Sequence, residues 1–248
     1  MHQQIEEYAL NAWPALQTLV HDGWLLRFAD GYTKRSNSVN ALFNAGEDHL
    51  EQKISRCEAL YHRAGLNAVF KVTPFVPGSL DRTLEACGYK LCDPSSVMIL
   101  EDLAAAAEPK LTDIECSPSL TPEWTDTFAS MNHGLSARNK AAMQKMLSQT
   151  VLQTGYFTLY QESVPVACGL GVIEDKFVGL FDIITSEDHR NWGYGEQLIL
   201  NILKWAKENG AAHSYLQVLQ DNLPANWLYE KLGYRQIYSY WYRSKALL

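Results

Sequence analysis

The chain has 248 residues, of which 47% are hydrophobic and 20% charged, with 15 Gly and 9 Pro. This composition is typical of one large or two compact folded domains and excludes disordered and fibrous proteins. The formal net charge of −7 comes from 28 acidic and 21 basic residues without a basic run, which argues against a nucleic-acid partner.

The first residues and the cysteines indicate the cellular compartment, and the histidines argue against a metal site. Residues 1–7 lack the basic and apolar regions of a signal peptide, and nowhere do about 18 apolar residues follow one another, so we expect a cytoplasmic protein with no membrane partner. Five cysteines without a Cys-x-x-Cys pair predict reduced, mostly buried thiols. The seven histidines are scattered, so no metal site is expected.

The chain carries an internal repeat. A shift of 145 residues aligns identical residues of the two halves, among them Leu25 with Leu170, Glu51 with Glu196, Gly65 with Gly210, Glu85 with Glu230 and Gly88 with Gly233. The first half is predicted to have one amphipathic helix and then, from about Trp24, the same element order as the second. Residues 103–109, with four consecutive alanines, interrupt the pattern as a helical turn or connector. We therefore predict domains at residues 1–102 and 112–248.

The second half has the clearer pattern. It predicts helices near 122–132 and 137–150, strands at 156–161, 165–173 and 177–185, a helix at 194–209, a strand at 214–219, a short helix at 225–232 and a last strand at 236–243. Gly210 stands where a left-handed residue ends the long helix.

One loop of this half has the composition of an anion-binding turn. Between Thr185 and Tyr194 the chain reads Asp-His-Arg-Asn-Trp-Gly-Tyr-Gly over residues 188–195, an Arg-x-x-Gly-x-Gly pattern. Free N–H groups at the helix start, with the positive end of its dipole and Arg190 beside them, suit phosphate oxygens. A strand-to-helix turn that needs only small residues is the alternative interpretation. The pattern matches neither a Gly-Lys-Ser/Thr loop nor the dinucleotide fingerprint.

A second pattern, Asp-Asn-Leu-Pro-Ala-Asn-Trp-Leu-Tyr-Glu-Lys-Leu-Gly-Tyr, follows at residues 221–234. Together the two patterns resemble those of the GNAT N-acetyltransferase superfamily, over about residues 112–248. The resemblance implies an α/β (α+β) acyl-CoA N-acyltransferase fold, in which helices flank a mixed, mostly antiparallel twisted sheet, here duplicated. It also implies that the sheet opens after the strand at 177–185 to bind acetyl-CoA as cosubstrate, without a metal.

The resemblance gives these residues roles. Main-chain groups of Ile183 and Thr185 would bond the pantetheine amides. Asn222 would contact the cofactor, and Tyr229 would both contact it and act as the catalytic acid that protonates the leaving thiolate; a core aromatic is the alternative for Tyr229. The diphosphate would lie on the backbone of Arg190, Asn191, Trp192, Gly193, Tyr194 and Gly195.

The general base stays open. Peptide N-terminal acetyltransferases of the superfamily carry a Glu where this chain has Gln217, which cannot take a proton. Three candidates for the base remain: Asp182, Glu174 and a water chain held by Tyr156 and Gln217. The alternative for either carboxylate is an exposed charge at the rim of the sheet, which is the commoner state of Asp and Glu.

The first half is expected not to bind CoA. The 145-residue shift places Ala45 at Arg190, Asp48 at Gly193, Leu50 at Gly195 and Leu84 at Tyr229, with Glu47 opposite Trp192. Two carboxylates repel a diphosphate. The polar segment 27–40, with Tyr32, Lys34, Arg35, Asn37 and Asn40, either reaches the acceptor cleft or forms a solvated hairpin face. Likewise the aromatic residues at 238–242 either frame that cleft or only pack.

The sequence thus predicts an enzyme that moves an acetyl group from acetyl-CoA to a primary amine of a small, amino acid-like acceptor by direct attack. A non-catalytic acyl-CoA-binding or regulatory module is the alternative, motivated by Gln217 and the altered first half. Tyr229 argues against that alternative, because binding alone needs no acid. Acetylation of protein lysines would need an open groove. The expected partner is a small-molecule amine, and a homodimer is compatible with the sequence.

Overall fold

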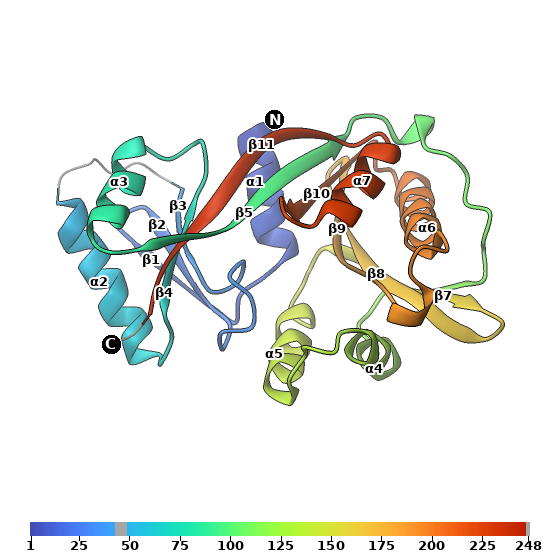
Figure 1. The fold of residues 1–248 in the computed structure, drawn as a ribbon, viewed down its shortest axis with the longest axis horizontal. Coiled ribbons are helices and arrows are strands. Elements are labelled where there is room, and N and C mark those ends of the chain that lie inside the picture. Colours follow the sequence, from blue (N-terminus) through green and yellow to red (C-terminus); the bar gives the residue numbers. More distant parts are fainter. Residues whose placement is uncertain (43–48, 247–248) are drawn as a thin grey trace.

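The computed structural model describes residues 1–42 and 49–246, and the strands in these ranges form one eleven-stranded sheet (Figure 1). The strands are β1 (Gln17–His21), β2 (Trp24–Phe28), β3 (Val39–Ala41), β4 (Ala68–Val72), β5 (Lys90–Leu100), β6 (Ile114–Ser117), β7 (Gln153–Gln161), β8 (Val164–Glu174), β9 (Phe177–Thr185), β10 (His213–Leu219) and β11 (Arg235–Lys245). The helices are α1 (His2–Ala12), α2 (Leu50–Arg63), α3 (Gly78–Ala86), α4 (Pro122–Met131), α5 (Ala137–Leu147), α6 (Tyr194–Glu208) and α7 (Leu223–Lys231). Short 3-10 turns occur at η1 (Leu103–Ala105) and η2 (Glu187–His189).

The elements predicted for the second half are confirmed, with ends shifted by up to three residues. Gly210 has a φ of 89°, as predicted for the residue after α6. Two short strands were missed. Strand β1 precedes Trp24, so the prediction of only a helix there was wrong, and β6 forms the far edge of the sheet. Both are short and largely exposed, and therefore carry little apolar alternation.

The repeat is visible in the element bounds. Gly78 and Leu223 begin α3 and α7, 145 residues apart, and Lys90 and Arg235 begin β5 and β11 at the same spacing. The spacing changes before residue 50. Val39 pairs with Phe70, whereas Tyr215, the counterpart of Phe70, pairs with Gly179, so β3 and β9 are related by a shift of 140 residues and not 145.

The two halves exchange their last strands. The sheet order is β1-β2-β3-β4-β11-β5-β10-β9-β8-β7-β6, in which β5 of the first half pairs with β10 and β11 of the second half pairs with β4. Strands β5 and β11 also pair with each other, and Figure 1 shows them running side by side across the centre of the molecule. Each half therefore completes the sheet of the other.

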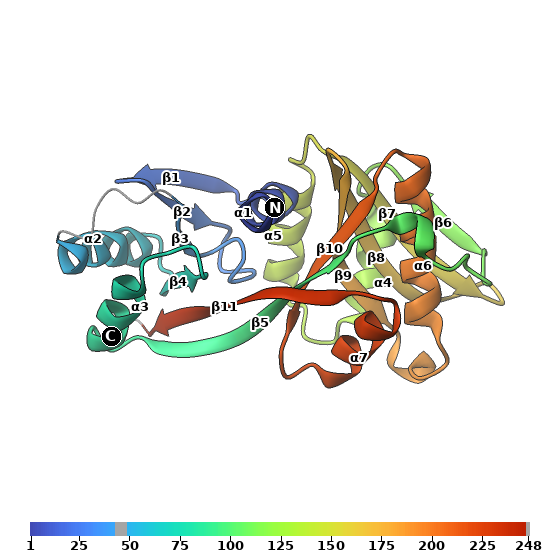
Figure 2. The ribbon, with the colours of Figure 1, turned by 90° about the horizontal axis from the view of Figure 1, so that it is seen from above.

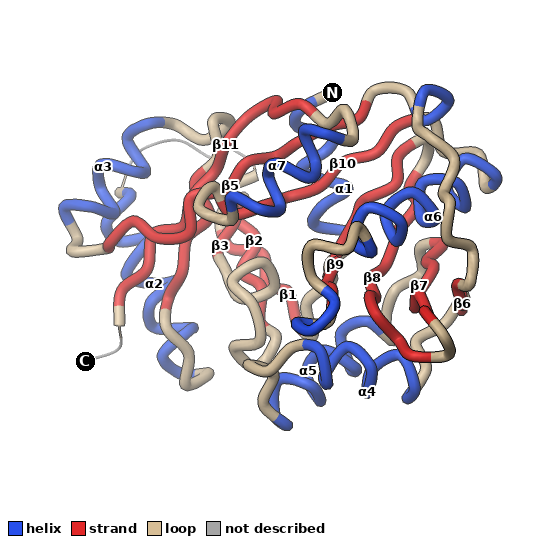
Figure 3. Tube along the Cα trace, turned by 45° about the vertical axis from the view of Figure 1, so that its right-hand side comes forward, coloured by secondary structure: helices blue, strands red, loops and turns tan. Residues whose placement is uncertain are grey.

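The helices cover the two faces of the second-half sheet separately (Figures 2 and 3). Helices α1, α4 and α5 pack on one face, here called the α1 face, where Trp13, Tyr156, Phe181 and Tyr215 are buried. Helices α6 and α7 pack on the other, the α6 face. Helices α2 and α3 enclose a separate core in the first half.

No helix in the described ranges is long and apolar enough to cross a membrane. Nor does any group of three or more His, Cys, Asp or Glu side chains in those ranges gather in a way that would hold a metal ion.

Candidate active site

The sheet opens between β9 and β10. These strands pair in parallel from Phe177 with His213 to Leu180 with Leu216, and the ladder ends there. Strand β9 continues to Thr185, still paired with β8 on its other side, and β10 continues to Leu219. The side of β9 that faces the opening therefore presents main-chain groups that β10 does not bind. Ile183 and Thr185 lie in this stretch, as the resemblance requires.

A bulge in β9 changes the direction of the strand at the opening. The register with β8 shifts between Cys168 and Leu170, and Asp182 takes a left-handed φ of 50°. Such a bulge turns the side chain of the extra residue away from the regular alternation. Phe181 packs on the α1 face and Ile183 on the α6 face, so Asp182 lies where the two faces meet at the opening.

The loop from β9 into α6 has the geometry of an anion site. Gly193 precedes α6 with a φ of 84°, which favours glycine, and no side chain caps the first N–H groups of the helix. A Cβ on Gly195 would lie 3.2 Å from the Thr185 Oγ1, so the helix start lies directly against the end of β9. Free N–H groups at the positive end of a helix dipole bind phosphate oxygens.

The side chains of this loop differ in exposure. Arg190 is exposed, 4.0 Å from the Glu187 carboxylate, and Trp192 is 74% exposed. Asn191 has a left-handed φ of 66°. Tyr194 is buried, with its ring near that of His189.

Helix α7 carries the other predicted residues. The Asn222 Oδ1 accepts a hydrogen bond from the Ala225 N–H and caps the helix, a structural role that the sequence analysis missed. The Tyr229 ring lies 5.9 Å from the Tyr234 ring, and its hydroxyl bonds to no residue in the described ranges. Burial raises the pKa of Tyr229 to about 12, against an opposing effect of the Arg35 charge.

The structure separates the three candidates for the base. Asp182 lies at the opening, and burial raises the pKa of its carboxyl to about 6 while the charge of Arg35 opposes that rise. Glu174 pairs with Phe177 at the other end of the β8–β9 hairpin, where it accepts a hydrogen bond from Asn11. Gln217 accepts a hydrogen bond from Tyr240, 3.4 Å away.

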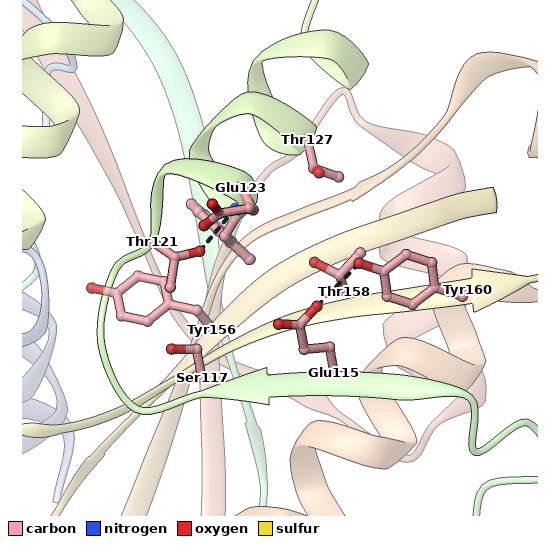
Figure 4. A pocket seen from close by; sticks show the side chains of 9 residues that line it. Glu115, Ser117, Thr121, Glu123, Thr127, Tyr156, Thr158 and Tyr160 are labelled. Atoms are coloured by element: carbon pink, nitrogen blue, oxygen red, sulfur yellow. Dashed lines mark hydrogen bonds between the residues drawn. The ribbon is translucent and has the colours of Figure 1, made fainter. Parts of the chain in front are cut away.

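Tyr156 lies elsewhere. It lines a small hollow between β6, β7 and α4, together with Glu115, Glu123, Thr158 and Tyr160 (Figure 4). Since this hollow lies toward the far edge of the sheet, Tyr156 and Gln217 do not form a pair, and Asp182 is the candidate that the fold brings to the opening.

The polar segment 27–40 contributes a residue to the opening. The solvated alternative is wrong for Tyr32, Asn37 and Asn40, which are buried. The Arg35 guanidinium lies over the rings of Trp13, at 5.5 Å, and Phe181, at 5.9 Å. The aromatic pair under it was not predicted, because Trp13 and Phe181 are far apart in sequence and each reads as an ordinary core residue.

Comparison with known proteins is consistent with this geometry. Residues 3–243 match the family described as the probable histone acetyltransferase Rv0428c C-terminal family. The chain is 29% identical to the uncharacterized N-acetyltransferase YobR of Bacillus subtilis (strain 168), over 98% of each chain.

Solved structures show the fold. A GCN5-related N-acetyltransferase from Kribbella flavida superposes with a TM-score of 0.76 at 13% identity, covering 100% of this chain and 96% of the other. A tandem GNAT protein from the clavulanic acid biosynthesis pathway superposes with a TM-score of 0.63 at 12% identity, covering 91% and 79%. The predicted fold class, a mixed and mostly antiparallel GNAT sheet flanked by helices, is confirmed.

Proposed function

We propose, since the chain belongs to the Rv0428c C-terminal acetyltransferase family and is a GNAT-type N-acetyltransferase, that it moves an acetyl group from acetyl-CoA to a primary amine of a small, amino acid-like molecule. The observation that carries the proposal is the opening between β9 and β10 beside the uncapped start of α6. A non-catalytic module is set aside, because the relatives are acetyltransferases.

The donor is proposed to bind on the α6 face of the second half. Main-chain groups of Ile183 and Thr185 would bond the pantetheine amides, and the N–H groups of residues 190–195 the diphosphate. Crowding at Gly195 supports this role, since a larger residue would meet Thr185 and fill the cradle. Acetyl-CoA supplies the thioester carbonyl that the amine attacks.

The first half is proposed to bind no donor. Leu84, the counterpart of Tyr229, is fully buried, and Leu50, the counterpart of Gly195, begins α2. The predicted counterparts Ala45, Glu47 and Asp48 lie outside the described residues. We retain the domain division at 1–102 and 112–248 as part of the proposal, with the last strands exchanged.

Asp182 and Tyr229 are proposed to move the protons. Asp182 takes one proton from the acceptor ammonium, the amine nitrogen forms a bond to the carbonyl carbon, the carbon–sulfur bond breaks, and Tyr229 protonates the thiolate. The second proton that the nitrogen loses as the amide forms returns to the Tyr229 phenolate. With a tyrosine pKa of about 12 and an ordinary thiol pKa of about 8.5, the last transfer is uphill by about 5 kcal/mol. A thiolate in the same buried opening also has a raised pKa, which reduces that cost.

The acceptor is proposed to be small. Polar atoms of Asp182, Gln217 and Tyr242 near the opening are shielded from solvent, which suits an enclosed ligand better than a protein surface. The matched family is described as a probable histone acetyltransferase, so a histone peptide belongs among the acceptors to be tested.

The five unpaired cysteines support a cytoplasmic location.

A thiol-release assay tests this function. Acetyl-CoA is offered with a panel of amino acids, simple amines and a lysine-containing histone peptide. Faster release with a small amine than with the peptide supports the proposal. A preference for the peptide would replace the acceptor class, and tight acetyl-CoA binding without release for any acceptor would contradict the reaction.

A further inference from the structure

The first half places the guanidinium of Arg35 at the opening in the second half. Arg35 comes from the loop that joins β2 to β3, and its guanidinium lies over two aromatic rings. Those rings, of Trp13 and Phe181, stack at 5.5 Å. Phe181 immediately precedes Asp182, so Arg35 lies beside the candidate base.

The loop holds Arg35 in a fixed position. The Asn37 Oδ1 accepts hydrogen bonds from the N–H groups of Ala29 and Gly31, at 2.7 and 3.0 Å. Arg27 donates to the Arg35 carbonyl at 2.9 Å and to the Leu10 carbonyl at 3.0 Å, which ties the loop to α1. A residue braced in this way loses little conformational entropy when a ligand binds.

Arg35 carries a positive charge without an ion-pair partner among the described residues. Burial opposes this charge, yet Tyr240, Tyr242 and Asp182 together raise the pKa of the guanidinium. A partly buried cation that makes no direct ion pair is costly unless an anion binds there. The guanidinium therefore fits a receptor for an anionic group.

Three buried polar atoms on neighbouring strands have no hydrogen-bond partner. They are the Asp182 Oδ2 on β9, the Gln217 Nε2 on β10 and the Tyr242 hydroxyl on β11. Arg35 interacts electrostatically with Asp182 and Tyr242, and Gln217 bonds to Tyr240. Buried polar groups in native proteins are normally paired, so this set indicates a ligand that completes it.

The set has two chemical ends. The Asp182 oxygen accepts hydrogen bonds, which suits an ammonium. Arg35 and the Gln217 amide donate them, which suits a carboxylate. Resting on the proposed function, we propose that Arg35 binds a carboxylate of the acceptor, so that the substrates are amines that also carry a carboxylate, namely amino acids.

Acetyl-CoA does not account for Arg35 and the three unpaired polar atoms. Trp13 and Phe181, which hold Arg35, are buried on the α1 face, whereas the loop predicted to bind the diphosphate begins α6 on the other face. The two ligands would thus approach the opening from opposite faces, and Arg35 belongs to the acceptor side.

Matched acceptors test the inference. Thiol release is measured with pairs that differ only by the carboxylate: alanine and ethylamine, leucine and 3-methylbutylamine, phenylalanine and 2-phenylethylamine, lysine and 1,5-diaminopentane. We expect kcat/KM for the acid of at least one pair to exceed that for its amine by about 30-fold, the strength of a charge-assisted hydrogen bond. An equal or greater kcat/KM for the amine in every pair would overturn the inference.

Variants separate binding from folding. At a pH well above 6, where Asp182 is ionised in both proteins, the preference is expected to fall to about 1 in Arg35→Met, through a higher KM for the acid and an unchanged kcat/KM for the amine. Arg35→Lys is expected to keep part of the preference. Lys34→Met is the control, since Lys34 pairs with Asp93. A preference that survives in Arg35→Met would overturn the inference.

Calorimetry gives a readout that does not need turnover. The N-acetylated form of the preferred amino acid is expected to bind the wild type and to lose most of its affinity in Arg35→Met, while acetyl-CoA affinity is unchanged. Acetyl-CoA binding with reaction of both members of every pair alike would overturn this inference and leave the proposed function standing. A wild type that binds no acetyl-CoA and acetylates no amine would overturn both.

Discussion

A Cβ placed on Gly195 would lie 3.2 Å from the Oγ1 of Thr185 and 3.6 Å from a methyl group of Leu228. The start of α6 is therefore held against both the end of β9 and α7. This contact joins the strand, the glycine loop and the helix that carries Tyr229 at one point. Changes at any of the three are expected to affect the donor site without unfolding the first half.

Tyr229→Phe tests the acid. We expect kcat to fall by about 100-fold or more, as for loss of a general acid, with the acetyl-CoA Kd nearly unchanged. Tyr160→Phe, which removes a hydroxyl bound to Glu115 far from the opening, is the control. Equal turnover in Tyr229→Phe and the wild type would remove Tyr229 from the mechanism.

The raised pKa of Asp182 predicts an acid limb in the pH profile of kcat/KM. Because the pKa of its carboxyl is about 6, the base is protonated below that pH, and kcat/KM is expected to rise with pH through about 6. In Asp182→Asn that limb should disappear and kcat should fall by about 100-fold. A wild-type profile that is flat between pH 5 and 7 would contradict the assignment.

A substitution of Arg35 is expected to shift the acid limb of the same pH profile. Its charge favours the ionised form of Asp182, so Arg35→Met should shift the limb to higher pH. The pH dependence of kcat/KM for an amine without a carboxylate measures this shift apart from substrate binding. An unmoved limb would mean that Arg35 and Asp182 act independently.

The exchanged strand β11 is anchored to the first half by Arg243. Its Nε and a terminal nitrogen bond the two oxygens of Asp81 on α3, at 2.8 and 3.0 Å, and this pairing lowers the pKa of Asp81 below 3.8. A lowered pKa stabilises the fold at neutral pH, and this contribution is lost as the pH falls below about 4.

Asp81→Asn should therefore lower the free energy of unfolding by about 2 kcal/mol at pH 7 and by much less at pH 3. Urea unfolding at the two pH values measures the difference. Glu85→Gln is the control, because Glu85 also lies near Arg243 but is 68% exposed. A loss of equal size at both pH values would exclude the ion pair as the cause.

The strand exchange also makes a prediction for separated halves. Because β10 pairs with β5 and β4 with β11, each half alone exposes an unpaired strand edge. Residues 1–102 and 112–248, produced separately, should fold poorly, and mixing should restore a one-to-one complex visible by circular dichroism and sedimentation. Independent folding of both pieces would contradict this prediction.

Much of the fold was predictable, because the repeat fixes the order of elements from α2 to β5 and from α6 to β11. The strand exchange was not, since β5 and β11 occupy equivalent places in the repeat and either can satisfy the backbone of β10. The glycine loop and Tyr229 follow from residue spacing. Arg35 and the left-handed Asp182 do not, because both depend on contacts between segments far apart in the sequence.

The most direct test of the central claim is calorimetric titration of acetyl-CoA into the wild type and into a double variant, Gly193→Asp with Gly195→Asp. Gly210→Asp is the matched control, because Gly210 has a similar φ and open space at the other end of α6. We predict one site per chain in the wild type and the control, and none in the double variant. Two sites per chain, or unchanged binding in the double variant, would contradict a single donor site at the start of α6.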